Sequence, residues 1–203
     1  MLRKQRIAVL VSGGGTNLQA LLDAQAAGQM PHGEIVLVVS NKEGAYALER
    51  AKQAGVESAV LTRAALGSAE AFENALMALL ADFKVDLIVL AGFLAILSER
   101  FTRAYEKRII NVHPSLIPAF CGKGFYGLRV HEAALAYGVK VTGATVHFVN
   151  EIPDGGEIIL QKAVEIREGD TPAVLQRRVM EEAEWLLLPA AVEKVCKERS
   201  QGE

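Results

Sequence analysis

The sequence predicts an α/β fold built on a twisted, mostly parallel sheet that is covered by helices on both faces. Along the first half of the chain, apolar runs alternate with segments of helical periodicity. The apolar runs are continuous, as expected for parallel strands that are buried on both sides. Farther along, two β-rich runs are joined by a turn, which indicates an antiparallel addition at the carboxyl-terminal end of the sheet.

The expected strands and helices follow one another in regular order. Strands are predicted at residues 7–11, 34–39, 58–61, 86–91 and 109–112. Helices are predicted at residues 18–27, 45–54, 69–83 and 98–105. Gly28 and Gly55 stand where glycine commonly ends a helix, because the left-handed conformation costs glycine little. This alternation favours the parallel part of the sheet.

The chain changes character after Pro114. The elements predicted there are a glycine-rich loop (121–127), a short helix (128–137) and strands at 140–149 and 158–166. Thr171 can cap a final helix that extends to about residue 197. Because no repeat, low-complexity tract or linker interrupts the sequence, we expect a single domain over residues 1–203.

Composition excludes several classes of function. The chain has 203 residues, of which 51% are hydrophobic and 23% charged, and its net charge of −2 favours neither a nucleic acid nor a membrane surface as partner. The first apolar run is too short for a signal peptide, and no later run could span a bilayer. Cys121 and Cys196 form no metal-binding or disulfide pattern, which suits a cytoplasmic protein, and the scattered histidines predict no metal site.

The first candidate site is the stretch VLVSGGGTNLQALL, in which a strand, a glycine loop and a helix follow directly. Backbone N–H groups at a helix amino terminus bind anions, and the helix could be capped by Thr16 or Asn17. Leu18 stands where a dinucleotide-binding loop has its third glycine, and no Walker lysine follows. We therefore expect a phosphate monoester here, the alternative being a tight turn without a ligand.

The second candidate site is the stretch RIINVHPSLIP. Asn111 and His113 are two residues apart on a predicted strand, so their side chains point the same way, and Pro114 ends the strand. In an open parallel sheet, ligands bind outside the carboxyl ends of the strands. This pair and the glycine loop both follow such ends, which favours one shared cleft, although a lone histidine there is often structural.

A turn supplies the third candidate. Asp154 in NEIPDGG is either an ordinary turn residue or a carboxylate that orients an imidazole and stabilises its charged form. Three other ionisable residues have ordinary interpretations from their local pattern. His147 is expected to be structural, His131 to lie on the surface, and Glu184 to belong to a solvated helix face.

Several segments taken together resemble the glycinamide ribonucleotide (phosphoribosylglycinamide) formyltransferases, a folate-dependent family. They are SGGGTNLQALL, SNKEGAYALERAKQAG, LAGFLAILS, NVHPSLIPAFCGKGFYG, TGATVHFVNEIPDGG and EIILQ, in that order. The resemblance extends from about residue 6 to 195. It implies the formyltransferase fold, with a Rossmann-like, phosphate-binding portion over about 1–110 and a folate-binding, catalytic portion over about 111–203.

The resemblance also implies a reaction. A formyl group would pass from N10-formyltetrahydrofolate to the amine of glycinamide ribonucleotide in purine biosynthesis, through a tetrahedral oxyanion and without a metal. Asn111, His113 and Asp154 match the catalytic set, which methionyl-tRNA formyltransferase and formyltetrahydrofolate deformylase share. Asn111 can donate to the oxyanion, His113 can also protonate the leaving nitrogen, and Asp154 can stabilise the imidazolium. The loop at 13–17 and the lack of an extra domain favour the ribonucleotide enzyme.

Further contacts are implied by the same resemblance. Gly15, Thr16 and Asn17 match the loop that binds the substrate phosphate, and Glu184 matches a substrate-contacting acid. The residues that match the folate pocket are Leu94, Ala95, Ile96, Leu97, Asn111, Asn150, Glu151, Ile152, Pro153 and Asp154. Ala95 and Ala69 replace arginines of some relatives, which leaves the contacts to the folate tail open.

Two other functions remain as alternatives. A formyltetrahydrofolate hydrolase would use water in place of the amine, and a non-catalytic module would bind phosphate ligands or folate without turnover. The oligomeric state, monomer or homodimer, is not predicted by the sequence.

Overall fold

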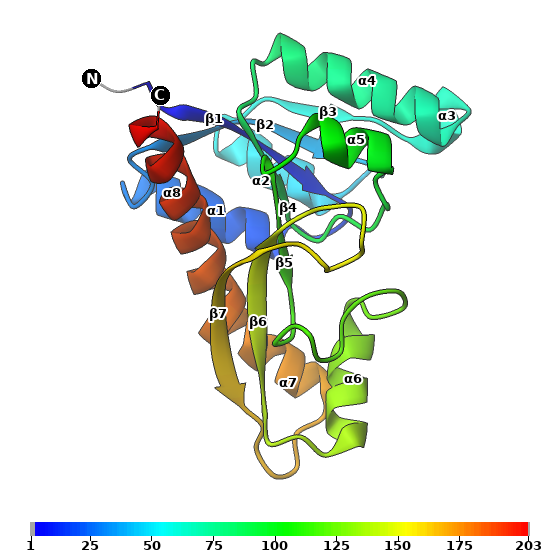
Figure 1. Ribbon diagram of the computed structural model, residues 1–203, viewed down its shortest axis with the longest axis vertical. Helices are drawn as coiled ribbons and strands as arrows, with labels where there is room; N and C mark the ends of the chain where they lie inside the picture. The colour runs from blue at the N-terminus through cyan, green and yellow to red at the C-terminus, as the bar shows by residue number, and fades with distance from the viewer. Residues whose placement is uncertain (1–2, 203) are drawn as a thin grey trace.

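The computed structural model describes residues 3–202 and contains one seven-stranded sheet (Figure 1). The strands are β1 (Gln5–Val11), β2 (Gly33–Ser40), β3 (Ser58–Val60), β4 (Leu87–Leu90), β5 (Ile109–His113), β6 (Val141–Phe148) and β7 (Ile158–Glu165). Their order across the sheet is β3-β2-β1-β4-β5-β6-β7. Residues 1, 2 and 203, which belong to the predicted domain range, lie outside the described residues.

The sheet has a parallel part and an antiparallel part. β1 pairs in parallel with β2 and β4, β2 with β3, and β4 with β5, whereas β6 is antiparallel to both β5 and β7. The predicted fold class is therefore confirmed. The predicted boundary near residue 110 falls inside β5, so hydrogen bonds of a single sheet connect the two predicted portions.

Helices connect the strands and cover the sheet. They are α1 (Thr16–Ala26), α2 (Tyr46–Gln53), α3 (Arg63–Leu66), α4 (Ala69–Asp82), α5 (Glu99–Ala104), α6 (Leu128–Tyr137), α7 (Pro172–Val179), the π-helical turn η1 (Met180–Glu184) and α8 (Trp185–Gln201). The predicted cap at Thr171 is confirmed, because its side chain accepts a hydrogen bond from the Val174 N–H. The single helix predicted after it is interrupted by η1, which carries one of the candidate residues.

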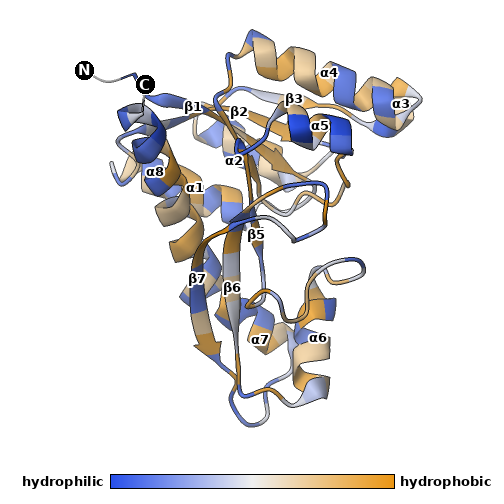
Figure 2. Cartoon of the chain, viewed as in Figure 1, coloured by the Kyte–Doolittle hydropathy of each residue, from blue (hydrophilic) through white to orange (hydrophobic). Residues whose placement is uncertain are grey.

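Apolar side chains on the two faces of the sheet form two separate cores. Along β1, Ile7 and Val9 belong to one core and Ala8 and Leu10 to the other, as the alternation of side chains in a strand requires. Helices α1, α2 and α8 cover the first face, and α4 and α5 cover the second. Figure 2 shows the inner strands as largely hydrophobic and the covering helices as mixed. This pattern is why the parallel strands are continuous apolar runs in the sequence.

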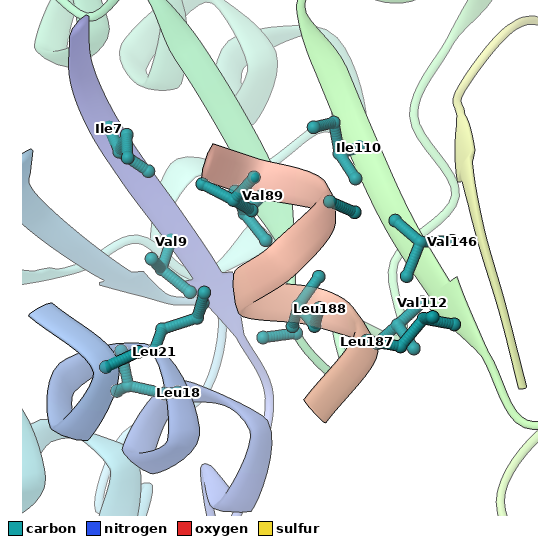
Figure 3. Packing of buried hydrophobic residues seen from close by; sticks show 14 of the residues in the cluster. Ile7, Val9, Leu18, Leu21, Val89, Ile110, Val112, Val146, Leu187 and Leu188 are labelled. Atoms are coloured by element: carbon teal, nitrogen blue, oxygen red, sulfur yellow. The ribbon is translucent and has the colours of Figure 1, made fainter. Parts of the chain in front are cut away.

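The first core fixes the final helix against the sheet. Figure 3 shows Leu18 and Leu21 of α1 and Leu187 and Leu188 of α8 gathered beside strand residues such as Val9. Packing of this kind places η1, which directly precedes α8, next to β6 and β7. Within residues 3–202, the helices are all too short or too polar to cross a membrane.

Candidate active site

A cavity of about 440 Å³ lies at the carboxyl ends of β1, β4 and β5. Its lining includes residues 13–17 after β1, 91–94 after β4, 111–114 at the end of β5, 125–127, Asp154, Gln176, Met180 and Glu184. Open parallel sheets bind ligands at this edge, since the loops that follow the strands meet there. The structure thus brings the glycine loop and the Asn111–His113 pair into one cleft.

Asp154 lies beside the catalytic candidates of β5 although it is far from them in sequence. Its Oδ2 is 3.5 Å from His113 Nδ1. The Gly122 N–H donates a hydrogen bond of 2.8 Å to the same oxygen, so the glycine-rich loop helps to hold the carboxylate. Asp154 has a φ of 57°, in the left-handed region that aspartate adopts more readily than most residues. Asp154 is therefore a turn residue, and the same turn directs its carboxylate toward His113.

Backbone contacts determine which nitrogen of His113 can exchange a proton. Nε2 is 2.9 Å from the Phe120 carbonyl oxygen, which can only accept, so Nε2 carries a hydrogen. Nδ1 is then the nitrogen that gains or loses a proton, and it is the one next to Asp154. The His113 side chain is almost fully buried, with an exposed fraction of 4%. Proton exchange on this ring therefore takes place at Nδ1, beside the Asp154 carboxylate.

His147 is a site residue that sequence reasoning missed, because the pattern predicted a structural role for it. It pairs with Asn111 across the antiparallel strands β5 and β6. Its Nδ1 is 2.8 Å from the Phe148 carbonyl oxygen, and its Nε2 is 3.2 Å from Asn111 Nδ2 and 3.7 Å from Asp154 Oδ1. In the neutral ring, Nδ1–H donates to the carbonyl and Nε2 accepts from Asn111. His147 therefore orients the amide, whose second N–H remains available.

The cavity keeps its acid and its imidazole in different charge states. Burial lowers the pKa of His113 below its ordinary value, and this outweighs the Asp154 carboxylate and the Phe120 carbonyl, which raise it. Burial alone would raise the pKa of Asp154, but the two imidazoles and the Gly122 N–H lower it, and the net shift is downward. At neutral pH, Asp154 is ionised and His113 is uncharged.

The glycine loop presents the uncapped amino terminus of α1 to the cavity. The expected side-chain cap is absent: Gly15 is the capping residue, with a φ of 71°, and it has no side chain to bond the free N–H groups. Asn17 is the second residue of the helix rather than its cap, and its Nδ2 donates to Glu184 Oε2 at 2.6 Å. Open N–H groups at a helix amino terminus are suited to an anion.

The three glycines of the loop, Gly13, Gly14 and Gly15, have different surroundings. A Cβ built on Gly15 would lie 2.7 Å from the Ala47 Cβ, so this glycine permits close packing of the loop on α2. A Cβ at Gly13 or Gly14 would meet no atom within 4 Å. The Arg50 Nε donates to the Gly14 carbonyl at 2.8 Å and fixes the loop from behind. The open positions, rather than Gly15, face the space that a ligand could occupy.

The chain is similar to known proteins over most of its length. The family described as Formyl transferase matches residues 5–192. The chain belongs to the formyl transferase family.

Individual relatives agree with this assignment. The chain is 41% identical to a phosphoribosylglycinamide formyltransferase from Haemophilus influenzae over 93% of its own length and 85% of that protein. It is 45% identical to the trifunctional purine biosynthetic protein adenosine-3 of Gallus gallus over 95% of its own length, but spans only 18% of that protein. A crystal structure of glycinamide ribonucleotide transformylase 1 from Symbiobacterium toebii superposes with a TM-score of 0.90, at 44% identity, covering 97% of this chain and 89% of that one.

The local pattern of this formyl transferase predicted that Glu184 lies on a solvated helix face, and this prediction is wrong. It lies in η1, lines the cavity and is only 5% exposed. Burial raises the pKa of Glu184, and the hydrogen bond from Asn17 lowers it only in part. A π-helical turn contains one extra residue, which changes the direction in which the following side chains point. That local irregularity is invisible in a charge pattern. The contact of Glu184 with a substrate stays a prediction.

The residues predicted to line the folate pocket separate into two groups. Leu94, Asn111 and Asp154 line the cavity. The others lie on the same two loops as Leu94 and Asp154 without lining it: Ala95, Ile96, Leu97, Asn150, Glu151, Ile152 and Pro153. Leu97 is buried, whereas Ile96 and Ile152 are exposed. Among residues 3–202, no cluster of three or more acidic, histidine or cysteine side chains suits a metal ion.

The prediction that His131 lies on the surface is wrong. It is fully buried on the inner side of α6, and neither ring nitrogen has a hydrogen-bond partner. Burial, reinforced by nearby His113, lowers the pKa of His131 to about 4. The sequence gives no direct signal of this, because the mixed polarity of α6 does not show which face packs inward.

Proposed function

We propose that this formyl transferase moves the formyl group of N10-formyltetrahydrofolate to the amine of glycinamide ribonucleotide, a step of one-carbon metabolism in de novo purine biosynthesis. The observation that carries the proposal is the convergence of Asn111, His113 and Asp154 on a cavity that also contains an open helix amino terminus. The three side chains suit formyl transfer, and the open helix amino terminus suits a phosphate. The names of the relatives support glycinamide ribonucleotide as the acceptor of the formyl group.

In the proposed mechanism, the neutral amine attacks the formyl carbon and a tetrahedral oxyanion forms. The free N–H of Asn111 donates to this oxyanion, and the other N–H is held by His147. The attacking nitrogen loses a proton and the departing folate nitrogen gains one. His113 Nδ1 carries that proton, because Nε2 is committed to the Phe120 carbonyl.

In this mechanism, Asp154 stabilises the transient positive charge on His113. The imidazole is neutral at rest because it is buried, and an imidazolium there needs a nearby anion. The Asp154 carboxylate, 3.5 Å away and held by Gly122, supplies it. The proton relay therefore needs no metal, and folate is a co-substrate that is consumed and replaced in each turnover.

The substrate phosphate is assigned to the amino terminus of α1, with Gly15, Thr16 and Asn17 in the loop. Glu184 would meet the ribonucleotide beside Asn17, to which it is hydrogen-bonded. Leu94, Ala95, Ile96 and Leu97, together with the loop that holds Asp154, would contact folate. We place the reaction in the cytoplasm, with small molecules rather than nucleic acid or membrane as partners.

A turnover assay tests the proposal. The purified chain is given both substrates and then each substrate alone, and formyl transfer and folate release are measured separately. Transfer that requires both substrates is the expected result. Folate release without the ribonucleotide would identify a hydrolase, and binding of both ligands without turnover would identify a binding module. Either outcome would overturn the proposed transfer.

A further inference from the structure

The catalytic cavity opens onto apolar side chains that have no partner in the fold. Leu94 lines the cavity, yet 56% of its surface is exposed. Ile96, two residues farther along the same loop, is 73% exposed, and Ile152 on the Asp154 loop is 59% exposed. Single exposed apolar residues are ordinary, but here they sit on the two loops that border one cleft. A ligand that extends out of the cavity would meet an apolar surface.

A cation is fixed at the outer end of this surface. The Arg63 Nη2 donates a hydrogen bond of 2.8 Å to the Ile96 carbonyl oxygen, and its guanidinium lies 5.9 Å from the centre of the Phe72 ring. Several other arginines are paired with carboxylates, among them Arg100 with Glu73 and Arg103 with Glu99. Over residues 3–202, Arg63 has no such carboxylate partner. Its remaining N–H donors are available to an anion.

We infer that Arg63 binds the glutamate carboxylates of the folate co-substrate and so sets the preference for the length of the folate tail. The inference rests on the proposed function. Folates combine an aromatic body with terminal carboxylates, which matches an apolar surface that ends in a guanidinium. Ala95, next to Ile96 on the same loop, has no charge to offer. The hydrogen bond to Ile96 holds the guanidinium in place before the ligand arrives, which limits the entropy lost on binding.

Substitutions at Arg63 separate charge from loop support. Arg63→Gln removes the charge but keeps a polar side chain of intermediate length, whereas Arg63→Ala removes the side chain beyond Cβ. Arg103→Ala is the matched control, because Arg103 is an exposed arginine that is already paired with Glu99 on α5. The measurements are kcat, KM for the ribonucleotide, and KM for formyl folates that carry one or several glutamates.

We expect Arg63→Gln and Arg63→Ala to raise the folate KM roughly two- to fivefold, the range of a solvent-exposed ion pair. The increase should be larger for the longer tail and should shrink at high salt. The kcat and the ribonucleotide KM should stay near those of the unchanged chain. An effect of Arg63→Ala that Arg63→Gln does not reproduce would mean loop support only, and an effect no larger than that of Arg103→Ala would also overturn the inference.

Direct binding keeps this test separate from the test of the proposed function. Unreactive tetrahydrofolate with a triglutamate tail and a tetrahydropterin without glutamate are titrated calorimetrically into the unchanged chain and into Arg63→Gln. Arg63→Gln should weaken binding of the first ligand only. This result can be obtained even if no formyl transfer is detected, in which case the proposed transfer fails and the carboxylate site stands. Equal affinities of both proteins for the triglutamate would overturn the site.

Discussion

The two sides of the cleft present different kinds of groups to the cavity. On the glycine-loop side, the groups that face the cavity are backbone N–H groups and open space beside Gly13 and Gly14. On the β5 side they are buried, titratable side chains, His113 and Asp154 among them. A backbone site is fixed by the chain trace and keeps its charge distribution at every pH. A side-chain site can change charge, and the pH at which it does so depends on how deeply the group is buried and on the charges beside it.

The difference has a consequence for substitutions. On the β5 side, loss of one side chain should remove a proposed chemical role that no neighbour duplicates. At Gly13 and Gly14 there is no side chain to remove, so the proposed anion site is tested there by adding atoms.

The largest effect is expected for His113→Ala. It removes the proposed proton carrier and should lower kcat by roughly 10²–10⁴, the usual range for general acid–base catalysis. Because burial holds the pKa of His113 below its ordinary value, the wild-type rate should change with pH below about 6.5. The variant should lose that limb of the pH–rate profile. His32→Ala, which alters a histidine bonded to Glu193 outside the cavity lining, is the control. A limb that survives in His113→Ala would assign the titration to another group.

A slightly smaller effect is expected for Asn111→Ala. Removal of one donor to an oxyanion costs roughly 10²–10³ in kcat. The KM of both substrates should change much less, since the hydrogen bond is strongest in the transition state. Steady-state kinetics with each substrate varied in turn gives both quantities. Equal losses in binding and in kcat would show that Asn111 instead supports the structure around His147.

The sequence predicted the sheet and the position of the site better than the contacts within it. Asn111 and His113 could be placed together because a strand has a strict period of two. His147 could not, because its place opposite Asn111 depends on the register of β5 with β6, which local pattern does not encode. The β6–β7 turn predicts that Asp154 lies on a loop, but not that the loop folds back onto His113.

Helical segments show the same limit. The final helix was predictable from Thr171 and its apolar periodicity, but the π-helical turn that places Glu184 beside Asn17 depends on packing against β6 and β7. The missing cap of α1 was not predicted either, because the helix begins directly after Gly15, so Gly15 rather than Thr16 or Asn17 stands at the capping position. Long-range partners decide what each polar side chain does.

The third prediction concerns the buried histidine behind the β5 side. With a pKa of about 4 in the folded chain and about 6.5 when unfolded, His131 binds a proton first in the unfolded state as the pH falls. Its contribution therefore leaves stability unchanged above pH 6.5 and lowers it progressively toward pH 4. Between pH 7 and pH 5, linkage gives a loss of about 2 kcal/mol.

His131→Leu should abolish this part of the pH dependence, whatever it does to stability at pH 7. Urea unfolding of both proteins at pH 7 and pH 5 measures the difference. Leu128→Ala, on the same helix and partly exposed, should keep the wild-type dependence. A His131→Leu chain that loses as much stability on acidification as the wild type would show that His131 is protonated in the folded state.

The smallest effect tests the glycine-loop side. Gly14→Ala adds one methyl group where no protein atom lies within 4 Å, so the fold should tolerate it. If phosphate occupies that space, the methyl group displaces it from one or more N–H donors. Loss of one such charge-assisted hydrogen bond should raise the ribonucleotide KM roughly tenfold. The folate KM should not change, because folate is assigned to the other loops.

Gly15→Ala is the informative comparison for that experiment. It places a methyl group 2.7 Å from Ala47 in a left-handed residue, so it should lower the melting temperature as well as ribonucleotide affinity. Gly14→Ala should leave the melting temperature nearly unchanged. A ribonucleotide KM that is normal in Gly14→Ala would place the phosphate elsewhere in the cleft. Loss of affinity only with loss of stability would mean that the loop matters as a packing element and not as the anion site.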